Sequence, residues 1–101
     1  TDDKTASFVK KYKEQFGETP NQFAADAYDC VYAIYEACNA EGVTADMSAQ
    51  EVCSALVDQF ATGKLVFSGV TGSNMTWDST GAVSKSPMAV VIKDGKYVLA
   101  D

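Results

Sequence analysis

The chain has 101 residues, 47% of them apolar and 22% charged, a balance typical of one small globular domain and not of a disordered chain. Its net charge of −6 at pH 7 repels phosphate backbones and anionic lipid, so we expect neither a nucleic-acid partner nor a peripheral membrane role. Histidine is absent and none of the three cysteines forms a C-x-x-C pair, which argues against a metal site.

The first helix is predicted over residues 4–16. Phe8, Tyr12 and Phe16 recur every four residues, so they form one stripe that we expect to face a core. Gly17 follows directly and suits the left-handed position that ends many helices.

A second helix is predicted after a short turn. Thr19 as N-cap, Pro20 as the first helical residue and Gln22 as the third match a capping box. The helical period then continues to about Ala40. Its apolar positions form a stripe that we expect to be packed: Ala24, Ala27, Tyr28, Val31, Ile34, Tyr35 and Cys38.

A third helix and several short strands complete the predicted order. Ser48 and Glu51 form a second capping box, and Gly63 follows the end of this helix. Beyond Gly63 the pattern indicates extended segments over 65–67 and 75–77 and an Asx turn that starts at Asp78. The sequence therefore predicts an α+β chain in a single domain, helical over residues 1–63 and extended over residues 64–101.

The last predicted element is a β-hairpin. Two apolar runs, residues 88–93 and 96–100, flank Asp94-Gly95, and Asp-Gly between such runs is the strongest short signal for a tight hairpin turn.

Several short motifs follow one another in order along nearly the whole chain. They are Phe16-Gly17, PNQFAADAYD at residues 20–29, FSGVTG at residues 67–72, Trp77-Asp78 with Gly81, and VIKDGK at residues 91–96. In this order and spacing they resemble the C-terminal portion of the branched-chain amino acid (Leu/Ile/Val) binding protein family.

This resemblance implies a parent protein with the type I periplasmic binding protein fold. In that family two α/β lobes, joined by three crossovers, close on a small solute like a hinged clamp. Residues 1–63 would supply helices to one lobe, and residues 64–101 would supply the last crossover and the closing strands. Most of the parallel sheet and at least half of the binding cleft would then come from sequence outside this chain.

The function that the resemblance implies is the solute-binding component of an ABC importer for branched-chain or related amino acids. Such a protein binds by lobe closure without catalysis or a cofactor, and it delivers its solute to a transporter permease. Its location would be extracytoplasmic, either periplasmic or anchored at the cell surface as a lipoprotein. The alternative is a ligand-sensing module of a receptor or amide-type regulator with the same fold.

Three residues of the second helix are candidates for the ligand-binding wall of the parent. The resemblance places Phe23 where relatives line the cleft with an aromatic ring, although a core position is the competing interpretation. Asp26 and Asp29 share a helical face and could meet a ligand ammonium. The interpretation we favour, more for Asp29 than for Asp26, is a solvated helix edge or acids of the first turns stabilised by the helix dipole. Tyr28 belongs to the same candidate set, while its place on the apolar stripe also suits a core residue.

The sequence gives little support for phosphate binding or nucleophilic catalysis. Gly69 and Gly72 lack the Lys-Ser/Thr pair that completes a phosphate-binding loop, and no histidine is present to activate a nucleophile, which leaves only a Ser–Lys pair open. We therefore expect no enzyme activity. The three cysteines, which we interpret as small buried apolar residues on helices, are Cys30, Cys38 and Cys53.

Self-association of the chain, or retention of a rearranged α+β core, is a further expectation. Helices whose apolar faces are shaped against a sheet must bury those faces elsewhere if the sheet is absent, and exchange of the terminal hairpin between two copies is one way to do so.

Overall fold

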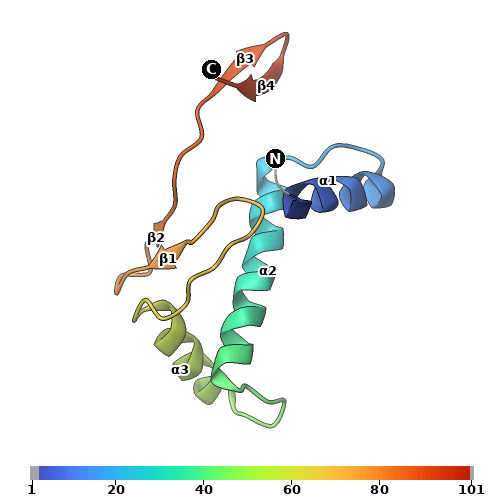
Figure 1. Ribbon diagram of the computed structural model, residues 1–101. Helices are drawn as coiled ribbons and strands as arrows, with labels where there is room; N and C mark the ends of the chain where they lie inside the picture. The colour runs from blue at the N-terminus through green and yellow to red at the C-terminus, as the bar shows by residue number, and fades with distance from the viewer. Residues whose placement is uncertain (1–2, 101) are drawn as a thin grey trace.

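The computed structural model describes residues 3–100 as three helices followed by two small antiparallel sheets (Figure 1). The helices are α1 (Asp3–Phe16), α2 (Gln22–Glu41) and α3 (Ala49–Phe60). The strands are β1 (Thr76–Trp77), β2 (Val83–Ser84), β3 (Val90–Lys93) and β4 (Lys96–Leu99). This order confirms the α+β prediction for the isolated chain.

The two predicted capping boxes have different outcomes. At α3 the Ser48 side chain accepts from Glu51 N at 3.1 Å, and the Glu51 carboxylate accepts from Ser48 N at 2.9 Å, as predicted. At α2 the prediction of Thr19 as N-cap is wrong. Asn21 is the N-cap, with its side-chain oxygen accepting from Ala24 N at 2.9 Å. An Asn side chain is a stronger N-cap than Thr, which moves the helix start two residues along the chain.

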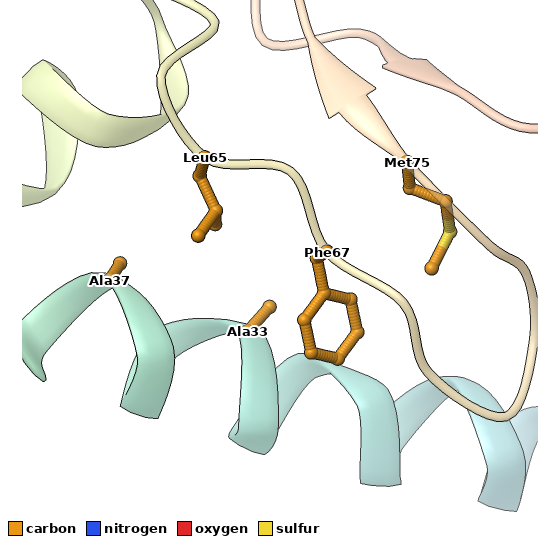
Figure 2. Packing of buried hydrophobic residues seen from close by; sticks show 5 residues of the cluster. All are labelled: Ala33, Ala37, Leu65, Phe67 and Met75. Atoms are coloured by element: carbon orange, nitrogen blue, oxygen red, sulfur yellow. The ribbon is translucent and has the colours of Figure 1, made fainter. Parts of the chain in front are cut away.

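The core lies between one face of α2 and the segment that follows α3 (Figure 2). Ala33 and Ala37 are buried on α2, and their small side chains let the extended segment approach the helix closely. Leu65, Phe67 and Met75 fill the space from the other side. Leu56, Phe60 and Trp77 pack at the margin of this cluster.

The large apolar residues of α2 do not face this core. Val31 and Tyr35 are each two residues from Ala33, which places them roughly 160° around the helix axis from it. They are 67% and 59% exposed. The expectation that the whole predicted stripe is packed is therefore wrong. The extended segment after α3 packs instead on the face of Ala33 and Ala37, because their small side chains let it approach the helix.

Helix α1 begins beside the N-terminal part of α2, and its later turns project away from α2 (Figure 1). The buried Phe8 ring lies 4.6 Å from the ring of Tyr28, centroid to centroid. Lys4 Nζ donates to Ser68 O at 2.8 Å, which ties α1 to residues 68–72, the link that follows Phe67. Phe16, which we expected to face the core, is 63% exposed at the far end of α1.

The first extended region is less regular than predicted. Phe67 and Met75 form an isolated bridge, with N–H···O distances of 2.9 and 2.8 Å, in place of a strand over 65–67. The predicted Asx turn is present, because Asp78 Oδ1 accepts from Thr80 N at 2.8 Å. Hydrogen bonds from Thr80 hold the pKa of the Asp78 carboxyl below its ordinary value. This turn joins β1 to β2, a strand that the sequence did not predict.

The terminal hairpin is confirmed. β3 and β4 pair around Asp94 and Gly95, which have φ angles of 54° and 75° and so adopt the left-handed conformation that a tight hairpin turn requires. The hairpin stands at the end of an extended arm, away from the helices (Figure 1), and all its strand residues are exposed. The radius of gyration of 16.2 Å reflects this arm, since a compact chain of this length has about 13 Å.

Candidate functional site

An open groove of about 370 Å³ lies between α2 and the segment that carries β1 and β2. Most of its lining is apolar and comes from α2, from the end of α3 and from the strand region. Trp77 and Phe60 meet there edge to face, with ring centroids 4.9 Å apart. The large apolar side chains that line the groove are Ile34, Phe60, Phe67, Met75, Trp77 and Val83.

Four polar side chains form a connected row along the groove. The Thr71 hydroxyl donates to Asp29 Oδ2 at 2.5 Å and accepts from Lys85 Nζ at 2.7 Å. Lys85 Nζ also lies 3.9 Å from Asp26 Oδ1. Because Asp29 is buried, the groove presents one accessible carboxylate, that of Asp26, and one ammonium group beside an apolar surface. Both side chains are partly exposed, so their mutual attraction is weak and each remains open to a ligand.

Asp29 fixes the link between the core segment and the strands. Its carboxylate accepts from Val70 N and Thr71 N, each at 2.8 Å, in addition to the Thr71 hydroxyl. The residue is only 6% exposed, so the interpretation of Asp29 as a solvated helix edge is wrong. Burial of a carboxylate is costly unless it is fully hydrogen-bonded, and these three donors meet that requirement.

Gly69 lets the link approach Asp29. A Cβ atom at this position would lie 2.5 Å from Asp29 Cγ and would overlap the carboxylate oxygens. The carbonyl of Gly72 accepts from Gly69 N at 2.9 Å, which closes the turn above the carboxylate. Glycine is therefore required here by the close approach of a side chain, since its φ is not in the left-handed region.

Replacement of Gly69 by alanine is expected to lower the free energy of unfolding by about 1–3 kcal/mol, because either the link or Asp29 must move. Urea denaturation followed by circular dichroism measures the change. The same replacement in an Asp29→Ala background is the matched control, and its cost there should be clearly smaller because the clashing group is gone. Equal costs in the two backgrounds would contradict the proposed close approach.

The three predicted site residues lie in different surroundings. Asp26 lines the groove. Phe23 is 71% exposed and lies one helical turn before Asp26 on the same side of α2, outside the groove lining. Tyr28 lies instead beside a smaller hollow of about 160 Å³, with Tyr32 and Lys4. The structure thus brings only Asp26 of this set to the groove.

Tyr28 is held by aromatic neighbours. Its ring lies between Phe8 and Tyr32, with centroid distances of 4.6 and 4.8 Å. A side-chain hydrogen bond with Tyr32 raises the pKa of the Tyr28 phenol above its ordinary value, and burial and the negative charge of Asp29 act in the same direction. Tyr28 is therefore neutral at physiological pH and packs between α1 and α2.

Thr71 and Lys85 are the groove residues that the sequence did not single out. They are 14 positions apart, and only the return of the chain through β1 and β2 brings them together. They form a Thr–Lys pair, but the Thr71 hydroxyl donates to Asp29 and Lys85 donates to Thr71. A lysine that activated the hydroxyl would have to accept its proton, whereas Lys85 donates to Thr71, so this bond holds the two side chains in place.

The cysteines are more exposed than predicted. Cys30 and Cys53 are exposed and Cys38 is partly buried, so the interpretation as buried apolar residues is wrong for the first two. All three are free thiols on helices, as expected, and Cys30 lies at the groove. Within residues 3–100 no cluster of three or more Cys, Asp or Glu side chains could hold a metal ion.

Comparisons with known proteins identified no relative of this chain. No family model, curated protein or solved structure matches this chain. Among the helices in the described part of the chain, none is long and apolar enough to cross a membrane. A function has to be inferred from the residues of the chain themselves.

Proposed function

We propose that this chain belongs to the solute-binding component of an ABC importer for branched-chain or related amino acids, and that it supplies one wall of the binding cleft. The observation that carries the proposal is the groove, where Asp26 and Lys85 lie 3.9 Å apart beside an apolar surface. An apolar amino acid has the matching chemistry, because it carries an ammonium, a carboxylate and an apolar side chain on neighbouring atoms.

Each part of the groove has a role in this proposal. The Asp26 carboxylate attracts the ligand ammonium, and Lys85 attracts the ligand carboxylate. Trp77 and Ile34 offer apolar surface to the ligand side chain. The groove volume of about 370 Å³ lies at the lower end of the range of small-molecule sites, about 300–1,000 Å³. No group in this arrangement has to make or break a bond.

The groove is open, so the chain alone forms an incomplete site. A small-molecule site usually buries most of its ligand, whereas a wall on one side leaves much of the ligand in water. In the parent a second lobe closes on this wall, and Phe23, exposed one turn before Asp26, contacts the solute from the rim. The closed form then docks on a transporter permease in an extracytoplasmic compartment.

Titration of leucine tests the proposal. We expect the isolated chain to bind leucine only weakly, with a dissociation constant on the order of 1 mM. Trp77, the one tryptophan of the sequence, reports binding through its fluorescence because it lines the groove. The Lys85→Met variant should lose the response, whereas Lys64→Met should keep it, since Lys64 pairs with Asp58 outside the groove.

Two results would contradict the proposal in different ways. Micromolar binding of leucine by the isolated chain would show that the site is complete and would contradict the one-wall arrangement. A leucine response that survives Lys85→Met, or no response at all, would contradict the assignment of the groove.

A further inference from the structure

The side-chain hydrogen bonds of Thr71 run in one direction. A hydroxyl has one proton to donate and two lone pairs that accept, whereas an ionised carboxylate only accepts. The Thr71 proton goes to Asp29, so the Thr71 oxygen is left as an acceptor at the groove, where Lys85 Nζ donates to it at 2.7 Å. Donation to the buried carboxylate makes this oxygen a stronger acceptor, because hydrogen bonds in a chain polarise one another.

The bond to Thr71, and not the ion pair with Asp26, determines where the Lys85 ammonium lies. Asp26 Oδ1 is 3.9 Å from Lys85 Nζ, which is beyond hydrogen-bond distance, whereas the contact with Thr71 is direct. The lysine stem passes beside Gly72, since a Cβ atom built there would lie 3.5 Å from Lys85 Cε. Thr71 N also donates to Asp29, at 2.8 Å. The acceptor that holds Lys85 is therefore itself anchored to a buried carboxylate.

The Lys85 ammonium has donors to spare. A lysine ammonium has three donors and no acceptor, and one of them is used on Thr71. The side chain of Lys85 is 34% exposed, so the other two donors are open to a ligand. A carboxylate is the group that matches them, because it only accepts and carries the opposite charge.

We propose that Thr71 is a positioning residue that fixes Lys85 Nζ for the carboxylate of the ligand, and that the groove for this reason selects ligands with a free carboxylate. The inference rests on the proposed function, since it concerns the same groove. Lysine has a flexible four-carbon stem, and a ligand that has to order such a side chain loses affinity. Because Thr71 already orders Lys85 in the free chain, this loss is avoided.

The first measurement needs no ligand. Nuclear magnetic resonance of the chain with isotope-labelled lysine detects ammonium groups whose protons exchange slowly with water because they are hydrogen-bonded. We expect such a signal from Lys85 and none from Lys96, which is exposed on the hairpin. The Lys85 signal should disappear in Thr71→Val, which has the shape of threonine without the hydroxyl, and remain in Thr71→Ser. Absence of the signal from the unaltered chain, or its persistence in Thr71→Val, overturns the proposal.

The second measurement separates positioning from a general loss of structure. Leucine and isoamylamine share the ammonium and the branched apolar side chain, but isoamylamine has no carboxylate. Trp77 fluorescence should show that the unaltered chain binds isoamylamine about tenfold more weakly than leucine. Thr71→Val should raise the dissociation constant for leucine by about three- to tenfold and that for isoamylamine by less than about twofold. A merely structural role of Thr71 would weaken both ligands alike.

The conservative variant and the unaltered chain complete the test. Thr71→Ser keeps the hydroxyl and should bind leucine within about twofold of the unaltered chain. Equal losses for the two ligands in Thr71→Val, equal affinities for them in the unaltered chain, or a Thr71→Ser variant as weak as Thr71→Val overturn the proposal. Failure of the unaltered chain to bind leucine contradicts the proposed function and with it the selection of a carboxylate, whereas the lysine signal decides on its own whether Thr71 fixes Lys85.

Discussion

Replacement of Asp29 by alanine is expected to lower the free energy of unfolding by about 3 kcal/mol. The carboxylate accepts hydrogen bonds from Val70 N, Thr71 N and the Thr71 hydroxyl, and it does so while almost fully buried. Its removal leaves two backbone N–H groups without their acceptor at a site that water reaches poorly. Loss of about 3 kcal/mol is a large share of the 5–15 kcal/mol that stabilises a typical domain.

Chemical denaturation of three variants separates this effect from a simple loss of charge. Asp26→Ala removes an exposed carboxylate one turn away on the same helix and should change stability by less than about 0.5 kcal/mol. Asp29→Asn retains one acceptor oxygen and should fall between the two. If Asp29→Ala and Asp26→Ala cost the same, the carboxylate does not fix the link as described.

Replacement of Phe67 by alanine is expected to lower the free energy of unfolding by about 3–5 kcal/mol. Phe67 is 2% exposed and fills the centre of the core between Ala33 and Met75 (Figure 2). Its backbone also bridges to Met75 in both directions. Because the two alanines of α2 are too short to fill the space that the ring leaves, a cavity would remain.

Thermal and urea unfolding, followed by circular dichroism, measure this cost. Phe67→Leu restores part of the volume and should lose clearly less, and this variant remains measurable if Phe67→Ala unfolds at room temperature. Phe23→Ala removes the same ring from an exposed position and should be nearly neutral for stability. A stable Phe67→Ala variant would mean that the groove side of the core can collapse, and the lining of the groove would then change with it.

Elements that depend on neighbouring residues were predictable from the sequence. The Ser48–Glu51 capping box and the Asp94-Gly95 turn both act over four residues or fewer, and both are present as expected. The error at the start of α2 is a competition between two nearby N-cap residues, Thr19 and Asn21, in which Asn21 is the one that caps the helix. Periodicity also identified the apolar stripe of α2. It did not predict that Val31 and Tyr35 on this stripe would be exposed.

The candidate site depends on contacts far apart in the chain and was only partly predictable. Asp26 was named from its helical position, whereas Lys85 had no signal because it meets Thr71 only through the turn between β1 and β2. The same holds for Asp29, whose partners lie 41 and 42 residues away. From the sequence alone an acidic residue on a helix is best interpreted as solvated, and only the tertiary structure supplies the donors that bury it.

The sequence by itself determined the three helices, the hairpin and the order in which they occur, since capping, period and turn chemistry are local properties of the backbone. Only the tertiary structure decided which side of α2 forms the core. Ala33 and Ala37 permit an extended segment to approach closely, and Leu65 and Phe67 fill the space that they leave. Packing of this kind depends on the shapes of two surfaces at once, which no single stretch of sequence contains.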